Sequence, residues 1–236
     1  MTERGRTSIE RSSQHFRVGP SSVQWNGQAF EFHLDELGFP IPRRVRGTVT
    51  VRPQSFTDFQ THLDGLGRHR WGPIAPCSHV EVDFPLQNLR WQGHGYFDSN
   101  SGDEPIHIPF RRWDWSRASL RDGRTAVIYD VQPKQGSDRV IARCFSPDGS
   151  SQAFEPEARL PLPRTAWGIQ RSTRGDAGVG AQVLQTLEDT PFYVRDMLSS
   201  QVLGEVTTSF HETLDCRRLA AWPIRMLLPF RMPRRA

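Results

Sequence analysis

Long apolar runs and paired cysteines are both missing from this sequence of 236 residues. No stretch approaches the ~18 consecutive apolar residues that a membrane-spanning helix needs, and the N-terminal residues lack the apolar segment of a signal peptide. The three cysteines, Cys77, Cys144 and Cys216, are odd in number and widely spaced, which fits neither a disulfide framework nor a zinc ribbon. We therefore expect a cytoplasmic protein in a reducing compartment, either soluble or peripheral to a membrane.

Motifs for nucleotides and for an activated serine are also absent. The sequence has no phosphate-binding loop, no dinucleotide fingerprint and no nucleophile elbow. The formal net charge of +4 admits an acidic partner, such as nucleic acid or an anionic membrane surface. Aromatic residues are not interleaved with Lys and Arg in a pattern typical of RNA or DNA binding, so we expect no nucleic-acid partner.

What the sequence does contain is alternation of apolar and polar residues, which is typical of half-buried strands. With 36% hydrophobic residues, 19 glycines and 18 prolines, the composition favours short strands and turns over long helices. Residues 22–37 predict a hairpin that turns at Asn26-Gly27. The same alternation predicts strands at 43–53, 78–84 and 89–98. Only residues 55–67 predict a short helix, with Ser55 or Thr57 as its cap.

Polar and turn-forming residues interrupt this pattern at 99–109, and the alternation then starts again. Two further hairpins are predicted, at 113–132 with a turn at Asp122-Gly123 and at 138–154 with a turn at Pro147-Asp148-Gly149. A Pro-rich stretch at 155–167 precedes predicted strands at 182–188, 191–196 and 201–213. We therefore expect an all-β protein of two antiparallel units joined near 100–112, closed as barrels because closure removes exposed strand edges.

Two short motifs place chemically active side chains on neighbouring strands. His69 and Trp71 would share one face of their strand, and Tyr96 and Asp98 would share one face of theirs. A carboxyl group in an apolar, aromatic-lined site loses solvation, which raises its pKa, so Asp98 could act as a general acid. Aromatic rings attract a cation, so the set suits chemistry that passes through a carbocation.

Simpler interpretations of the same residues remain open. Asp98 could start the following turn, and Trp71 and Tyr96 could be ordinary core aromatics. Five histidines lack the paired spacing of zinc sites, so we expect no metal; they are His62, His69, His79, His94 and His107. Residues 210–215 are better explained as a strand end than as a metallopeptidase helix. The segment 222–235 mixes apolar and basic residues, which fits either contact with anionic lipid or a closing strand with a solvated basic end.

Several motifs in the same order resemble the bacterial carotenoid 1,2-hydratases, also called hydroxyneurosporene synthases, over nearly the whole chain. They are IPRRVRGTV (41–49), GRHRWGPIAP (67–76), VEVDFP (80–85), GYFDSNSGDEP (95–105), WDWSRA (113–118), LEDTPFYVRD (187–196) and LLPFRMPRR (227–235). The resemblance implies a hydro-lyase that hydrates the terminal 1,2 double bond of acyclic carotenoids such as neurosporene and lycopene, without an organic cofactor. It also implies a peripheral location at the inner or photosynthetic membrane.

The His-x-Trp and Tyr-x-Asp motifs match the family's functionally required residues, which implies catalytic roles for His69, Trp71, Tyr96 and Asp98. By that analogy Asp98 protonates C2, Trp71 and Tyr96 stabilise a tertiary cation at C1, and His69 assists the water or the acid. The family is similar to paired lipocalin-like barrels, which implies a first unit at 1–108 and a second at 109–236.

Family members carry further strands ahead of the segment that matches the start of this chain, so we expect the first unit to be incomplete. Two alternatives to the enzyme are a non-catalytic lipocalin-like carrier of carotenoid or lipid and an inactive truncated homologue.

Overall fold

The computed structural model describes residues 5–38 and 41–227, and most of them lie in antiparallel strands. Eight strands form the first sheet, in the order β1-β2-β3-β4-β5-β7-β6, with β8 paired along β7. Their bounds are β1 (Ile9–Arg11), β2 (His15–Val18), β3 (Ser21–Trp25), β4 (Phe30–Leu37), β5 (Arg44–Pro53), β6 (Thr61–His62), β7 (His69–Phe84) and β8 (Leu89–Gly102).

The second sheet has seven strands, in the order β12-β11-β10-β9-β17-β16-β15. They are β9 (Phe110–Ser119), β10 (Thr125–Pro133), β11 (Arg139–Phe145), β12 (Ser151–Ala153), β15 (Gln182–Asp189), β16 (Tyr193–Val202) and β17 (Glu205–Asp215). A separate ladder pairs β13 (Leu160–Leu162) with β14 (Arg171–Thr173). The helical elements are short: η1 (Arg6–Ser8), η2 (Pro85–Gln87), α1 (Cys216–Ala220) and α2 (Trp222–Leu227).

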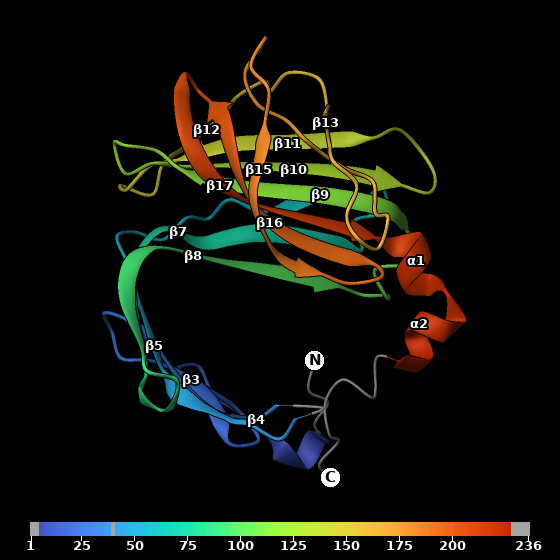
Figure 1. The fold of residues 1–236 in the computed structure, drawn as a ribbon. Helices are drawn as coiled ribbons and strands as arrows, with labels where there is room; N and C mark the ends of the chain where they lie inside the picture. Colours follow the sequence, from blue (N-terminus) through green and yellow to red (C-terminus); the bar gives the residue numbers. More distant parts are fainter. Residues whose placement is uncertain (1–4, 39–40, 228–236) are drawn as a thin grey trace.

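The first sheet curves strongly, so that β3 to β5 swing away while β7 and β8 lie against the second sheet (Figure 1). This arrangement confirms the predicted all-β class of antiparallel, lipocalin-like units. The strand orders are open, because among the described strands β1 does not pair with β6 and β12 does not pair with β15. Closure into barrels by hydrogen bonding is therefore not seen in the described part of the chain.

The predicted hairpin turns are confirmed at the residues that the sequence indicated. Asn26 Oδ1 accepts hydrogen bonds from the amides of Gln28 and Ala29, and Gly27 has a φ of +96°. Gly123 and Gly149 also have positive φ, of +86° and +89°. Glycine adopts this left-handed backbone without the steric cost of a Cβ, so each of these turns is set by local sequence.

The predicted helix at 55–67 is wrong. The segment is extended beside β7, where the amides of Thr57 and Leu63 donate to the carbonyls of Ile74 and His69 at 3.2 and 2.8 Å. Asp64 then accepts from three backbone amides, including that of His69 at 2.7 Å, which turns the chain back into β7. Pairing with the following strand outweighs the local helix signal, because short helices gain little without tertiary packing.

Strand β8 is longer than predicted and runs through residues 99–102, so the break between the sheets covers only 103–109. The pairing of β7 with β8 shifts register around Ala75, from Pro73↔Asp98 to Ser78↔Gly95. The extra residues on β7 form an irregularity of the kind that bends a strand and changes the direction of its side chains.

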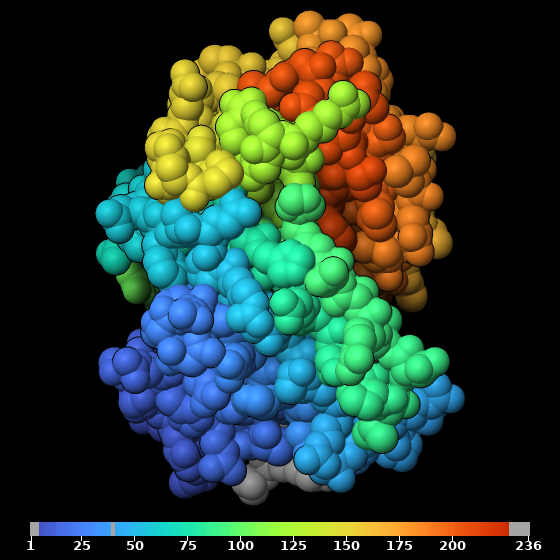
Figure 2. Space-filling view, turned by 90° about the vertical axis from the view of Figure 1, so that its left-hand side faces the viewer, coloured from blue at the N-terminus to red at the C-terminus, as the bar shows by residue number. Residues whose placement is uncertain are grey.

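One hydrophobic core is shared between the two sheets. Trp71 and Cys77 from the first sheet pack with Phe110, Tyr129 and Phe145 from the second. On the face shown in Figure 2 the segments of the first sheet pass directly under those of the second. The change of sheet falls between β8 and β9, while the division into units 1–108 and 109–236 stays a prediction, since the main core crosses it.

The chain leaves the second sheet through α1 and α2 on one side of the molecule (Figure 1). Residues 210–215 lie in β17, as expected for a strand end, and Asp215 caps α1 by accepting from the amides of Arg217 and Arg218. In the segment 222–235, residues 222–227 form α2 rather than the closing strand of one interpretation. Residues 228–235 lie outside the described residues.

Candidate active site

Three of the four predicted site residues meet in one hydrogen-bonded cluster. Trp71 on β7 and Asp98 on β8 point to the same face, because Trp71 pairs with Asn100 and Pro73 with Asp98. The indole Nε1 of Trp71 donates to Asp98 Oδ2 at 2.8 Å, and the hydroxyl of Tyr96 donates to the same oxygen at 3.1 Å. The shared faces that the sequence predicted are therefore observed.

The two oxygens of Asp98 differ in their surroundings. Oδ2 accepts both hydrogen bonds, whereas Oδ1 makes none within the described part of the chain. Oδ1 is also not among the fully buried atoms that lack a partner, so it keeps contact with solvent. In a protonated carboxyl group the carbonyl oxygen is the better acceptor, which places the acidic hydrogen on Oδ1.

Burial raises the pKa of Asp98, against the opposing effect of the hydrogen bonds from Trp71 and Tyr96. Burial also holds the pKa of Tyr96 well above its usual value, with the nearby Asp98 charge acting in the same direction. Tyr96 therefore stays protonated and acts as a donor. The site holds an acid that is easier to protonate than an exposed aspartate, with two donors aimed at one of its oxygens.

Aromatic side chains of the second sheet enclose this cluster, and sequence reasoning did not single them out. The Tyr129 ring lies 5.4 Å from that of Trp71, and the Trp115 ring lies 5.4 Å from that of Tyr96. Trp113 contacts Tyr129 in turn, at 5.5 Å. The spacing of Trp113 and Trp115 in the sequence could have indicated an aromatic face, because alternate residues of a strand share a face.

Strand β9 also brings a cation to the cluster. The guanidinium of Arg117 lies 5.6 Å from the centre of the Tyr96 ring and 5.2 Å from that of Phe210. Burial lowers the pKa of Arg117, and none of the described carboxylates lies within ion-pair distance of it. The attraction to the two rings takes the place of an ion pair.

Unpaired nitrogens lie along the same face of β9. The indole Nε1 atoms of Trp113 and Trp115 and Nη1 of Arg117 are buried without a hydrogen-bond partner among the described residues. A buried donor without an acceptor costs about 1–3 kcal/mol, so such groups normally bond to something that the protein binds, such as water. Two of these three residues touch Tyr96.

His69 is not part of the hydrogen-bonded cluster. It pairs with Gly102, which lies four residues beyond Asp98 on β8 and so about 13 Å along an extended strand. Its ring is buried and packs edge-on against Phe110 at 5.0 Å, and its Nε2 has no hydrogen-bond partner among the described residues. His69 thus lies on the same strand face as Trp71 but further along it.

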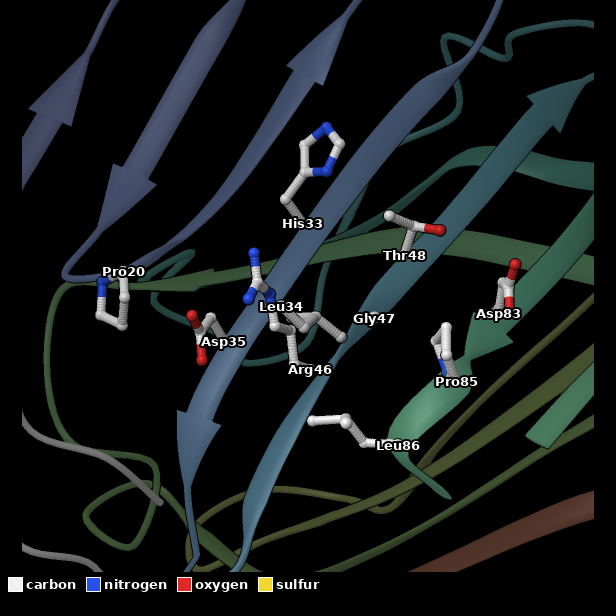
Figure 3. A pocket seen from close by; sticks show the side chains of 10 residues that line it. All are labelled: Pro20, His33, Leu34, Asp35, Arg46, Gly47, Thr48, Asp83, Pro85 and Leu86. Atoms are coloured by element: carbon white, nitrogen blue, oxygen red, sulfur yellow. The ribbon is translucent and has the colours of Figure 1, made fainter. Parts of the chain in front are cut away.

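A separate cavity of about 580 Å³ opens in the first sheet, away from Asp98. Strands β4 and β5 form its wall, with His33, Asp35 and Arg46 among the lining side chains (Figure 3). Sequence reasoning did not indicate it. The candidate acid, in contrast, lies at the contact between the two sheets, where the aromatic residues gather.

No cluster of three or more metal-binding side chains is found within residues 5–38 and 41–227. None of the helices in these ranges has the length and apolar character needed to cross a membrane.

The family model and the most similar relatives among known proteins point to the same family. The model of the family described as carotenoid hydratase CrtC matches residues 1–236. The chain is 56% identical to the acyclic carotenoid 1,2-hydratase of Rubrivivax gelatinosus and 44% identical to that of Thiocapsa roseopersicina, over 100% and 99% of its own length. The protein of that name from Rhodobacter capsulatus is 36% identical over 100% of the chain, which covers 84% of that relative.

The chain spans 58% of the length of the Rubrivivax and Thiocapsa relatives. Among solved structures, a Nitrosomonas europaea protein given the name AttH is similar, with a TM-score of 0.65 and 12% identity. That match covers 90% of this chain and 73% of the solved chain, and at this identity it is informative about the fold alone.

Proposed function

Because the chain belongs to the carotenoid hydratase family, we propose that it adds water across the terminal 1,2 double bond of an acyclic carotenoid such as lycopene or neurosporene. The proposal rests on how the two carboxyl oxygens of Asp98 are hydrogen-bonded. One of its oxygens is held by Trp71 and Tyr96, while the other is free to meet a substrate.

In the first step Asp98 Oδ1 gives its proton to C2 of the alkene, and the two electrons of the double bond form the new C–H bond. This leaves a tertiary cation at C1 and a carboxylate on Asp98. The carboxylate forms between two donors that are already in place, so little reorganisation is needed when the charge appears. Burial favours the protonated acid before this step, and the hydrogen bonds stabilise the anion after it.

Water then adds to C1 through its oxygen and loses a proton, which returns to the Asp98 carboxylate. The product is a tertiary alcohol and the acid is restored. The addition changes no oxidation state overall, so the reaction as proposed requires neither a redox cofactor nor a metal. We assign one hydrogen bond to the water oxygen to the unpaired indole N–H of Trp115, whose ring touches Tyr96, so that the second lone pair of the water is free to attack C1.

Trp71 and Tyr96 act in this proposal mainly as positioning residues. The Trp71 side chain is buried, with only 1% of its surface exposed, and its N–H already donates a hydrogen bond to Asp98. Arg117 lies over the Tyr96 ring, which leaves less of that ring for a substrate cation. His69 would assist through its unpaired Nε2, by binding water further along the same strand face.

The test is incubation of the purified chain with lycopene dispersed in detergent, followed by mass spectrometry. We expect a product heavier by one water, no product from Asp98→Asn, and unchanged turnover in Asp103→Asn. Asp103 is a matched control because it is exposed and its carboxylate makes no contact within the described residues. Turnover of lycopene by Asp98→Asn at the rate of the unmodified chain would exclude Asp98 as the acid.

The second candidate is a carotenoid or lipid carrier without chemistry, as in an inactive truncated homologue. It is favoured by the cavity of about 580 Å³ in the first sheet, which lies away from the proposed acid. A carrier would retain lycopene, seen as a shift of its absorption spectrum, and give no hydrated product. In that case Asp98→Asn would leave retention unchanged.

A further inference from the structure

Arginines gather around a cavity of about 320 Å³ at the end of the second sheet where the chain leaves it for α1. The lining contains five arginines and a single acidic residue, Asp215. The arginines come from three places in the chain: the start of β9, the segment before β14, and α1. They are Arg111, Arg112, Arg164, Arg217 and Arg218.

The positive charge of this cavity is only partly balanced. Arg111 pairs with Asp138 at 3.2 Å and Arg112 with Asp114 at 2.8 Å. Arg164 and Arg217 make no ion pair and no side-chain hydrogen bond within the described part of the chain. The cavity therefore has excess positive charge at its two exposed arginines.

Arg218 adds charge that is fixed in place. Its guanidinium donates to the carbonyls of Trp167, Gly168 and Pro191 at 2.7, 3.1 and 3.2 Å. Carbonyl oxygens orient the group without cancelling its charge. The nearest carboxylate, that of Asp215, is 3.8 Å away and already caps α1.

Two buried nitrogens in the cavity wall have no acceptor. The Nε atoms of Arg111 and Arg112 are buried and unpartnered among the described residues, although both arginines use a terminal nitrogen in an ion pair. Gln132 and Gln170 add neutral donors to the lining. An oxyanion with several acceptor oxygens would satisfy the exposed guanidinium groups of Arg164 and Arg217 together with the two glutamines, since arginine presents its donors in a fork that matches phosphate.

Exposed aromatic and apolar side chains lie close in the chain to residues that line the cavity, since Trp167 precedes Gly168 and Trp222 follows α1. Trp167, whose carbonyl binds Arg218, is 57% exposed, and Trp222 at the start of α2 is 75% exposed. Met226 on α2 is also exposed, and Arg225 beside it is basic. Tryptophan next to arginine is typical of surfaces that lie at the interface of a bilayer, where the indole enters the headgroup layer.

We propose that this cavity binds the phosphate of an anionic lipid headgroup and that Trp167 and Trp222 enter the membrane interface beside it. The volume is about ten times the ~30 Å³ that one water molecule occupies in the liquid, which leaves room for a phosphate and part of its glycerol. The exposed Trp167 and Trp222, each close in the chain to lining residues, favour a lipid over free phosphate as the source of the anion. The site is separate from Asp98 and does not depend on hydration activity.

The test measures co-sedimentation of the purified chain with vesicles of phosphatidylcholine, with and without phosphatidylglycerol. We expect binding to the anionic vesicles, and a loss of affinity of about tenfold to thirtyfold in the double variant Arg164→Gln/Arg217→Gln, as removal of two arginines that contact the headgroup layer should give. The matched control is Arg90→Gln/Arg121→Gln, with the same change in net charge, at side chains that are 79% and 85% exposed. It should bind within about twofold of the unmodified chain.

Equal losses in the two double variants would show that diffuse charge, and not this cavity, binds the vesicles, and would overturn the proposal. A second arm adds inorganic phosphate and follows the melting temperature. A rise that disappears in Arg164→Gln/Arg217→Gln, without vesicle binding, would overturn the lipid assignment in favour of a free phosphate. No vesicle binding and no phosphate effect would exclude the site altogether.

Discussion

Trp71 and Asp98 lie on adjacent antiparallel strands, and the indole N–H of one donates to a carboxylate oxygen of the other at 2.8 Å. The bond lies at the contact between the two sheets, where Tyr129 covers the indole from the second sheet. The hydrogen bond connects the fully buried indole of Trp71 to the partly exposed carboxylate of Asp98. The proposed acid is therefore positioned by the core of the protein.

Replacing Trp71 by Phe should change the pH dependence of hydration. The Trp71 hydrogen bond lowers the pKa of Asp98, so its loss should raise that pKa above its already raised value. Activity requires the protonated acid and falls as pH rises through this pKa. The falling limb of kcat/KM should thus move to higher pH in Trp71→Phe, while the maximal kcat drops about tenfold to a thousandfold because the carboxylate loses a donor.

The measurement is a pH–rate profile of the unmodified chain and of Trp71→Phe from about pH 5 to 9. The control is Trp91→Phe, which makes the same change at an indole on β8 that is 48% exposed and has no hydrogen bond within the described residues. Its profile should match that of the unmodified chain. A falling limb that stays in place in Trp71→Phe, or moves to lower pH, would contradict the role of Trp71.

Trp115→Phe should separate formation of the cation from its capture. The change keeps an aromatic ring beside Tyr96 but removes the unpaired N–H to which we assign the water oxygen. In D2O, a cation that water fails to capture loses H⁺ from C2 and returns as substrate carrying deuterium. We expect the ratio of deuterated substrate to hydrated product to rise about threefold to tenfold, as loss of one hydrogen bond implies.

Mass spectrometry of recovered substrate and product gives this ratio directly. An unchanged ratio with normal turnover would exclude Trp115 as the residue that binds the water. It would not contradict the role of Asp98 as the acid. Absence of deuterium from both substrate and product in the unmodified chain would instead contradict protonation by Asp98, so the two failures are distinguishable.

Gly102→Ala should disturb His69 without touching the acid. A Cβ at residue 102 would lie 2.5 Å from Nδ1 and 2.7 Å from Cε1 of His69, so the imidazole would have to move. If His69 assists the reaction, hydration should fall about tenfold, a loss of ~1.4 kcal/mol of transition-state stabilisation. Gly65→Ala is the control, since nothing lies within 4 Å of a Cβ there. Full activity of Gly102→Ala with a displaced His69 signal in NMR would argue against a role for this histidine.

The alternation of residues in the sequence was sufficient for the longer strands and for the shared faces of Trp71, Tyr96 and Asp98, but it did not indicate the short strands β1, β2, β6, β13 and β14. It could not give the partners of these residues from the second sheet, because Trp115 and Arg117 meet Tyr96 only through the packing of one sheet on the other. The helix expected at 55–67 fails for a different reason, because the backbone of this segment pairs with β7 within the first sheet. Alternation places His69 on the same face as Trp71, but it does not give the register of β7 on β8, which sets the distance of His69 from Asp98 along the strand.

A buried ion pair between Asp196 of the second sheet and Arg171 of β14 should control stability at low pH. Asp196 is fully buried, and both of its oxygens accept from Arg171, with a further bond from Thr186 at 2.8 Å. Burial raises the pKa of Asp196, but the surrounding His211, Thr186 and Arg171 side chains outweigh this effect and hold the pKa below its usual value. Its folded pKa is thus lower than its unfolded pKa, so its contribution to stability is complete above the unfolded value and is lost as pH falls towards the folded one.

Asp196→Ala should lower the free energy of unfolding by about 3–5 kcal/mol near neutral pH, because it leaves the Arg171 guanidinium buried without its partner. The loss should shrink below about pH 4, where unmodified Asp196 binds a proton in the unfolded chain and loses its advantage. Urea unfolding followed by fluorescence at several pH values measures both effects. Glu10→Ala, at an exposed pair with Arg17, should change stability by less than about 1 kcal/mol. A loss in Asp196→Ala that stays constant from neutral to acidic pH would show that packing, and not the ion pair, is responsible.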